Sequence, residues 1–104
     1  MAASGLGGAL PAYVIYKAEV LDADRYEEYK LLASASIDAA GGRYLVRGGD
    51  FVALEGEAPA GRTVVVEFPS REAALEWYKS EEYTTARRLR EGAADATMYL
   101  VDGV

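Results

Sequence analysis

The residues of this chain best suited to chemistry are one acid, three bases and a phenol that fall inside predicted strands. They are Lys17, Arg43, Arg47, Glu67 and Tyr99. A carboxylate in a water-poor space has a raised pKa and can serve as general base or acid, and guanidinium groups form forked hydrogen bonds with carboxylates and enolates. Together they predict a site for a small carboxylate or an enolisable metabolite, where Glu67 moves the proton while Arg47 and Lys17 stabilise the anion.

The elements that must position these residues follow the order strand, helix, strand, strand, helix, strand. Alternating and β-branched runs predict strands at residues 13–20, 43–47, 62–68 and 96–101, and helical spacing predicts helices at about 24–40 and 71–92. The second helix could be two helices in series. This order is the split βαβ arrangement of the α+β class, in which both helices cover one face of a four-stranded antiparallel sheet.

Short polar side chains mark where the helices begin. Asp22 or Asp24 can cap the first helix, and Glu27 stands three residues after Asp24, as in a capping box. Ser70 can cap the second helix, and Ser80 can cap its continuation.

Residues 1–11 are rich in Ala and Gly and contain no Lys or Arg, so we interpret them as a flexible tail that lacks the features of a secretory signal. Residues 12–104 are expected to form one domain. No apolar run is long enough to cross a bilayer. We therefore expect a cytoplasmic protein with no membrane partner.

Strand alternation assigns the side chains to two faces of the sheet. The apolar set, expected under the helices, is Val14, Tyr16, Ala18, Tyr44, Val46, Val64, Val66, Phe68, Met98 and Leu100. The opposite set mixes charges with apolar residues and is Ile15, Lys17, Glu19, Arg43, Leu45, Arg47, Thr63, Val65, Glu67, Thr97, Tyr99 and Val101. A contiguous apolar patch on a soluble protein is usually an interaction site, so we expect this second face to be covered by a second copy in a two-fold homodimer.

Each candidate residue also has a purely structural interpretation. Glu67 could simply neutralise Arg47 or Lys17. A shifted pKa would not exclude this interpretation, because structural ion pairs also shift pKa values. Arg43 and Arg47 could bind a small acidic ligand or could pair with acids across the dimer.

Two further candidates lie in the second helical region. Trp77 could stack on a planar ligand at the rim of the enclosed space, or it could anchor the core. Arg90 could reach the mouth of that space, although a run such as residues 87–90 is typical of a solvated helix face.

Composition excludes several classes of function. The net charge is −6 and no basic stripe offsets it, so nucleic acid is not expected as a partner. The chain contains no cysteine and no histidine, which removes thiolate nucleophiles, the usual zinc sites and the commonest general base. The acidic loop residues Asp50, Glu55 and Glu57 could bind a hard cation but are more simply solvated. We therefore expect neither a metal nor a tightly bound cofactor.

Several motifs resemble the family called domain of unknown function 1330. The matching stretches are 42–49 (Gly-Arg-Tyr-Leu-Val-Arg-Gly-Gly), 54–56, 66–70 (Val-Glu-Phe-Pro-Ser), 74–78 and 80–83, with Arg90. The resemblance runs from about residue 13 to the end. It implies a ferredoxin-like subunit that dimerises through its open sheet face into a dimeric α+β barrel.

The resemblance implies no established reaction. The wider superfamily contains cofactor-free monooxygenases, muconolactone isomerases, haem-dependent enzymes and ligand-sensing modules, and the missing histidine argues against the haem branch. Three hypotheses remain open: a cofactor-independent enzyme acting on a small acidic metabolite, a non-catalytic metabolite-binding or accessory module, and a dimer whose enclosed charges are structural.

Overall fold

The computed structural model of the chain describes residues 10–104, which form four strands and three helices. In chain order they are β1 (Ala12–Val20), α1 (Ala23–Ala39), β2 (Arg43–Arg47), β3 (Arg62–Phe68), α2 (Arg71–Lys79), α3 (Glu81–Arg90) and β4 (Ala94–Asp102). The second predicted helix is therefore two helices in series. Of the expected flexible tail, all but the last two residues lie outside the described part of the chain.

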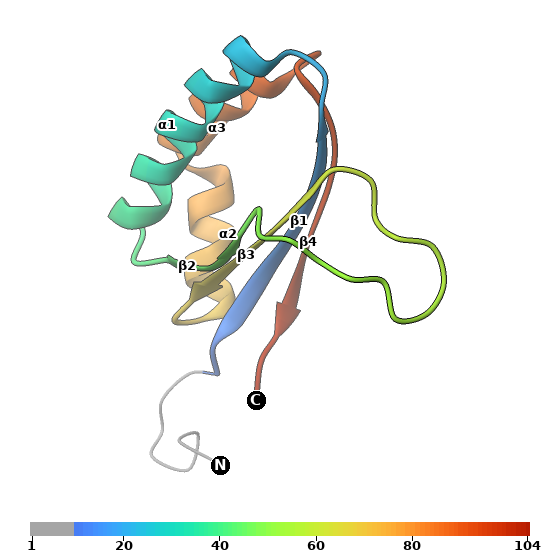
Figure 1. Cartoon of the computed structure of the whole chain (residues 1–104). Helices are drawn as coiled ribbons and strands as arrows, with labels where there is room; N and C mark the ends of the chain where they lie inside the picture. Colours follow the sequence, from blue (N-terminus) through green and yellow to red (C-terminus); the bar gives the residue numbers. More distant parts are fainter. Residues whose placement is uncertain (1–9) are drawn as a thin grey trace.

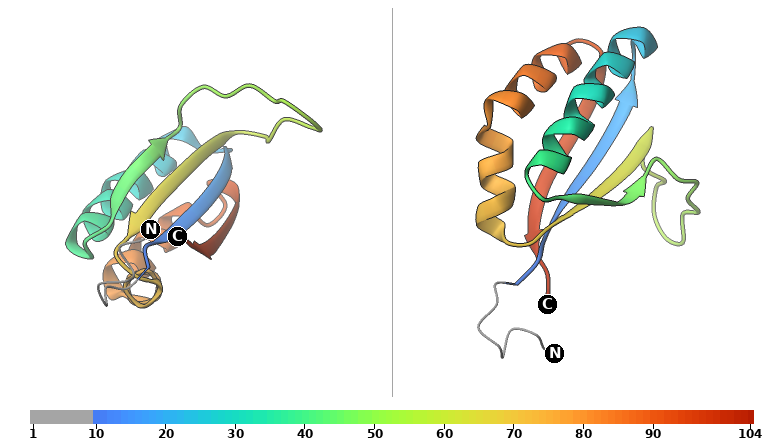
Figure 2. Two further views of the ribbon diagram at one scale, coloured as in Figure 1. Left: turned by 90° about the horizontal axis from the view of Figure 1, so that it is seen from below. Right: turned by 90° about the vertical axis from the view of Figure 1, so that its left-hand side faces the viewer.

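The strands form one antiparallel sheet in the order β2-β3-β1-β4. All three helices cover the same face of this sheet, as Figure 1 shows from the side and Figure 2 from two further directions. This is the ferredoxin-like α+β fold that the order of elements predicts. Among the described residues, no helix combines the length and the apolar character needed to span a membrane.

The helices begin at capping residues that the sequence indicates. The side chains of Asp22, Ser70 and Ser80 cap α1, α2 and α3, and each accepts a hydrogen bond of 3.1–3.2 Å from the backbone N–H three residues further on. The alternative capping box of Asp24 and Glu27 is wrong, because Asp24 already lies in the first turn of α1. Each such cap satisfies an otherwise unpaired backbone donor and is worth about 1 kcal/mol.

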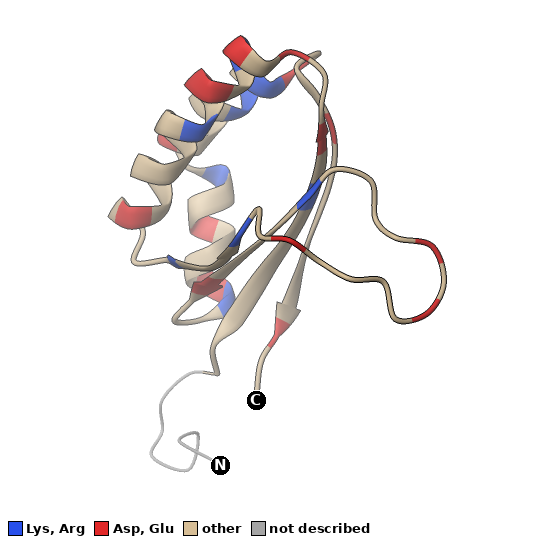
Figure 3. Ribbon diagram, viewed as in Figure 1, with Lys and Arg blue, Asp and Glu red and all other residues tan. Residues whose placement is uncertain are grey.

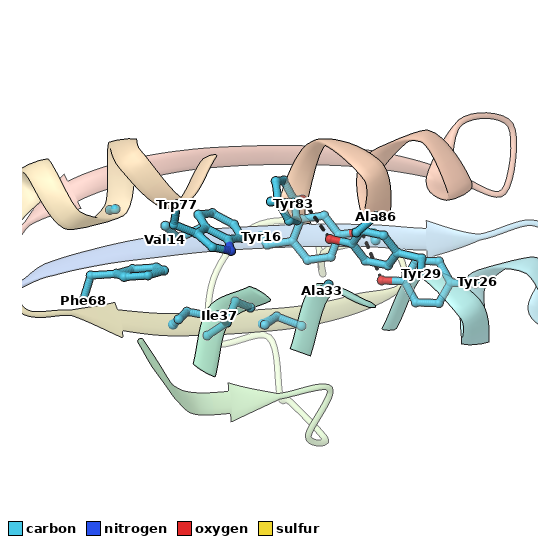
Figure 4. Close-up of a cluster of buried hydrophobic side chains, with 14 residues drawn as sticks. Val14, Tyr16, Tyr26, Tyr29, Ala33, Ile37, Phe68, Trp77, Tyr83 and Ala86 are labelled. Atoms are coloured by element: carbon cyan, nitrogen blue, oxygen red, sulfur yellow. Dashed lines mark hydrogen bonds between the residues drawn. The ribbon is translucent and has the colours of Figure 1, made fainter. Parts of the chain in front are cut away.

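Aromatic rings fill most of the space between the helices and the sheet (Figure 4). The ring of Trp77, 2% exposed, lies 5.3 Å from that of Phe68 and 4.1 Å from that of Tyr83, measured between centroids. The indole N–H donates a hydrogen bond of 3.0 Å to Ser36 Oγ, so its one polar atom is satisfied. Trp77 is thus a core residue.

A β-bulge in β2 changes which side chains face the helices. Tyr44 is opposite Val66, but the next paired residue, Val46, is opposite Val65, so Leu45 is an extra residue in the strand. The extra residue reverses the alternation after it. The sequence assignment of Val46 to the helix side and of Arg47 to the open side is therefore wrong, because Arg47 is opposite Val64 and lies on the helix side.

The face of the sheet without helices exposes a mixture of apolar and charged side chains. Ile15 and Val65 are half-buried at its centre, while Tyr99 and Val101 near β4 are 57% and 44% exposed. The loop between β2 and β3 projects beyond this face, away from the helices (Figure 1). It carries the largely exposed side chain of Leu54.

Candidate anion-binding site

A cavity of about 30 Å³ lies between α1 and the sheet. Its lining residues come from all four strands and from α1 and α2, and they are Val14, Tyr16, Tyr26, Tyr29, Lys30, Ala33, Ile37, Tyr44, Arg47, Arg62, Val64, Val66, Trp77 and Met98. The rings of Tyr26 and Tyr29 form part of its wall, and α1 packs along α3. The charged groups of the lining are three cations, and none of the lining residues is acidic.

Arg62 is the cation most deeply involved in this cavity. It is the first residue of β3 and is opposite Ala18 on the helix side of the sheet. Its guanidinium carbon lies 5.9 Å from the centre of the Tyr26 ring. The guanidinium also lies against Gly48, where a Cβ atom would approach its Nη2 to 2.8 Å and where φ is +72°. Glycine adopts this left-handed conformation without strain, and its missing side chain leaves room for the guanidinium of Arg62.

The Nε atom of Arg62 is buried and has no hydrogen-bond partner among the described residues. Arginine cannot lose its charge in a protein, so this donor belongs to a permanent cation. A buried donor without a partner costs about 1–3 kcal/mol, and more when the group is charged. A residue that lines the cavity thus carries a positively charged donor that no described residue satisfies.

The electrostatics of the cavity oppose those of the whole chain. The chain carries a net charge of −6, and acidic residues are spread over the outer surface of α1 and along the β2–β3 loop (Figure 3). Lys30 forms an ion pair of 2.8 Å with Glu27 on the same helix. Arg47 and Arg62, however, form no ion pair with any described residue, and the guanidinium of Arg47 instead lies 4.3 Å from the centre of the Tyr44 ring.

Four tyrosines, three of which also line the cavity, form a buried cluster (Figure 4), and Arg90 at the end of α3 contacts it. The hydroxyls of Tyr16 and Tyr26 are 3.0 Å apart, and those of Tyr29 and Tyr83 are 2.9 Å apart. Arg90 donates a hydrogen bond of 3.2 Å to the Tyr83 hydroxyl, and its guanidinium lies 5.3 Å from the ring centre of Tyr16. Burial raises the pKa of Tyr26 and of Tyr29 above the ordinary value, so both hydroxyls stay protonated and can donate hydrogen bonds.

The sheet separates the site residues predicted from the sequence into two groups. Those on the helix side are Arg47, Trp77 and Arg90. Those on the open face are Lys17, Arg43, Glu67 and Tyr99. The expectation that Arg47 lines one space together with Lys17, Glu67 and Tyr99 is therefore wrong. The bulge places the side chain of Arg47 on the helix side of the sheet. The side chain of Arg90, at the end of α3, contacts the tyrosine cluster.

On the open face, Glu67 pairs with a residue other than the two expected. Arg43 Nε donates a hydrogen bond of 2.7 Å to Glu67 Oε1, and the Tyr13 hydroxyl donates one of 3.2 Å to Oε2. The expected pairing with Arg47 or Lys17 is wrong, because Arg43 is directly opposite Glu67 in the sheet. The hydrogen bond from Arg43 lowers the pKa of Glu67 below its ordinary value, which makes this carboxylate a weaker base than a free glutamate.

Sequence reasoning missed Arg62, although a signal for it exists. Arg62 stands two and four residues before Val64 and Val66, which are both on the helix side, so the same alternation predicts a cation under the helices. Its position at the start of a strand obscured that signal. Among residues 10–104, no group of three or more His, Cys, Asp or Glu side chains is placed to hold a metal ion.

The fold defines the chain as a ferredoxin-like α+β protein with a cation-lined cavity beneath its helices. The chain belongs to the family described as domain of unknown function (DUF1330), whose model matches residues 11–104. Among curated proteins, none matches the chain significantly.

Solved structures share the fold over nearly the whole chain. A protein of unknown function from Rhodopseudomonas palustris is similar with a TM-score of 0.72 and 18% identity, covering 91% of this chain and 83% of that one. A dimeric ferredoxin-like protein from Thermobifida fusca matches with a TM-score of 0.61 and 11% identity, covering 91% and 92%. SnoaB, a cofactor-independent oxygenase from Streptomyces nogalater, matches with a TM-score of 0.59 and 10% identity, covering 92% and 95%. At these identities the similarity shows the fold alone.

Proposed function

We propose that this protein binds a small organic anion, a carboxylate or an enolate, in the cavity between α1 and the sheet. The observation that carries the proposal is the buried, unpartnered Nε of Arg62. A carboxylate oxygen is the natural acceptor for such a donor, because charge-assisted hydrogen bonds to guanidinium groups are short and about twice as strong as neutral ones. The bound anion would remove the cost of leaving a charged donor unpaired.

The residues that line the cavity also favour a negatively charged ligand. Lys30, Arg47 and Arg62 line it without any acid, and attraction between charges is stronger in a partly dry site than in water. The tyrosine hydroxyls next to the cavity add neutral hydrogen-bond donors. The volume of about 30 Å³ exceeds the roughly 10–15 Å³ that one water molecule requires on this measure, so the cavity has room for a small polar group.

The open face supports assembly into a homodimer. It groups half-buried Ile15 and Val65 with partly exposed Val101, and a contiguous apolar patch of this kind is usually an interaction site. The β2–β3 loop extends past this face with the exposed side chain of Leu54, where a second copy would cover it. The similar protein from Thermobifida fusca is described as dimeric.

A second candidate function is catalysis on the bound anion, without a cofactor. Its support is that Arg62 and Arg47 would stabilise an enolate formed in the cavity, next to the hydrogen-bonded hydroxyls of Tyr16 and Tyr26, which could pass a proton. A protein of the same fold, SnoaB, is described as a cofactor-independent oxygenase. In this proposal Glu67 would act only on a ligand held between two protomers, because it lies on the opposite face of the sheet.

The proposed binding is tested by thermal unfolding of the wild type and of Arg62→Met with increasing benzoate, with benzamide as the neutral matched compound. At ten times the Kd, benzoate should stabilise the wild type by about 1.4 kcal/mol, which is a rise in Tm of roughly 5–10 °C for a domain of this size. The rise should be absent in Arg62→Met and with benzamide. Arg43→Met, which removes a cation from the open face, is the matched control and should keep the full shift.

The behaviour of Arg62→Met without ligand gives an independent check. If Arg62 serves a ligand, removing its unpaired buried charge should leave the Tm unchanged or raise it, because an uncompensated charge destabilises the folded state. A benzoate shift that survives in Arg62→Met, or no shift in the wild type, would contradict the proposed anion site.

A further inference from the structure

We infer that the ligand is an amphipathic monocarboxylic acid whose carboxylate enters the Arg62 cavity and whose apolar body lies in an open groove between α1 and β2. This inference rests on the proposed function and assigns the class of ligand. The groove has a volume of about 690 Å³, far larger than the cavity of about 30 Å³. The small, charged space and the large, open one thus suit two different parts of one molecule.

The groove and the cavity adjoin. Ile37 from α1 and Tyr44 and Arg47 from β2 line both of them. Because β2 is the edge strand of the sheet, the groove opens to solvent, and a ligand can enter from the side without separating the helices from the strands.

Arg47 stands at the boundary between the two spaces. Its side chain reaches this side of the sheet only because of the bulge at Leu45, and bulges often re-aim a side chain next to a functional site. It is exposed, forms no ion pair with a described residue and lies over the Tyr44 ring. Because Arg47 lines both spaces, it is the second guanidinium placed to bind the carboxylate.

The walls of the groove favour an apolar body without a second charge. Leu31 and Ala35 on α1, together with the shared Ile37, supply apolar surface, and Leu31 is 73% exposed. The groove contains one acid, Asp38, while the charge of Arg43 is already neutralised by Glu67. A second carboxylate at the far end of the ligand would therefore meet a like charge and no free cation.

Two other surface depressions differ from this groove in their lining residues. A depression of about 520 Å³ between α1 and α3 is lined by Glu81 and Glu82, contains no cation and shares no residue with the cavity. A third depression, of about 140 Å³ beside α2 and β4, has apolar walls and shares Val14, Trp77 and Met98 with the cavity, but no cation lines it. The α1–β2 groove, in contrast, meets the cavity at a cation, Arg47.

The test is isothermal titration of the wild type with straight-chain acids from acetate to octanoate, with suberate as the matched diacid and octanamide as the uncharged control. Each methylene that leaves water contributes about 0.8 kcal/mol when fully buried, so the affinity should rise roughly two- to fourfold per methylene in a partly open groove. Suberate should bind at least tenfold more weakly than octanoate, and octanamide should show no measurable binding.

Variants separate this inference from the proposed function. Leu31→Glu should abolish the dependence on chain length while acetate binding stays intact, and Leu32→Glu, which faces the α1–α3 depression, should behave as the wild type. Arg62→Met should lose every acid. Arg62-dependent binding of acetate with no gain from longer chains would overturn the groove and leave the anion site standing. Absence of binding for all acids would contradict both the anion site and the groove. Equal binding of octanoate and octanamide would show that neither hypothesis is right in requiring a carboxylate.

Discussion

The two faces of the sheet treat charge in opposite ways. On the open face the acid and the base meet each other, since Glu67 accepts a hydrogen bond of 2.7 Å from Arg43 in a pair that stays partly hydrated. Under the helices, the guanidinium of Arg62 lies beside the ring of Tyr26 and that of Arg90 beside two tyrosine rings, and neither arginine forms an ion pair with a described acid. The acid of the open face is thus paired within the chain, whereas these two arginines under the helices have no acid partner among the described residues.

This difference indicates where a ligand belongs. A charge already paired near water offers little binding energy, because exposed ion pairs are worth at most about 1 kcal/mol and are screened by salt. An unpaired cation beside a cavity can gain a full charge-assisted interaction from an outside anion. The open face, which carries Glu67, is therefore better suited to dimer assembly than to binding a metabolite.

The largest difference between the faces is expected in packing. Phe68, which is fully buried against Trp77, should lose about 3–5 kcal/mol of unfolding free energy on substitution by Ala. Ile15→Ala, on the half-buried open face, should cost about 1 kcal/mol at protein concentrations where the chain is monomeric, since much of its surface is already in water. Urea unfolding measures both. Equal costs at low concentration would contradict the distinction between a packed face and an open one.

The expected homodimer gives the next largest effect. Val65→Lys places a charge at the centre of the open face, where a second copy would bury it without a partner. Light scattering after gel filtration should show the mass fall from twice the chain mass to the chain mass, with an unchanged far-ultraviolet spectrum. Leu31→Lys on the outer surface of α1 is the control and should remain dimeric. A wild type that elutes as a monomer, or a dimeric Val65→Lys, would show that the open face is not the interface.

The smallest effect concerns pH. Arg43 lowers the pKa of Glu67, so the pair stabilises the folded state above the ordinary glutamate pKa of about 4.3 and loses that contribution as the pH falls through the lowered value. In Glu67→Gln, the fall of Tm on acidification should be shallower than in the wild type. It should not vanish, because Arg71 lowers the pKa of Asp102 in the same way. An unchanged Tm profile would show that the Glu67 pair contributes nothing, and Glu76→Gln on α2 is the matched control.

The sequence predicts the fold well because each of its signals is local. Alternation in the strands, the capping serines at 70 and 80, and the helical spacing of residues 71–92 all depend on neighbours a few positions apart. The predicted site fares less well. Its residues were grouped by assuming unbroken alternation in every strand, and one inserted residue in β2 is enough to move Arg47 to the other face.

The spacing of residues along the chain predicts the order of the elements and the antiparallel sheet with one helix-covered face, and the composition excludes histidine and cysteine chemistry. The pairing of Glu67 with Arg43 and not Arg47, and the position of Arg62 at a cavity lined by no acid, emerge only from the folded structure. The physical reason is that a bulge and an unpaired buried donor depend on register between strands and on the packing of a helix against them. Neither the bulge nor the unpaired donor can therefore be predicted from the residue spacing within a single strand or helix.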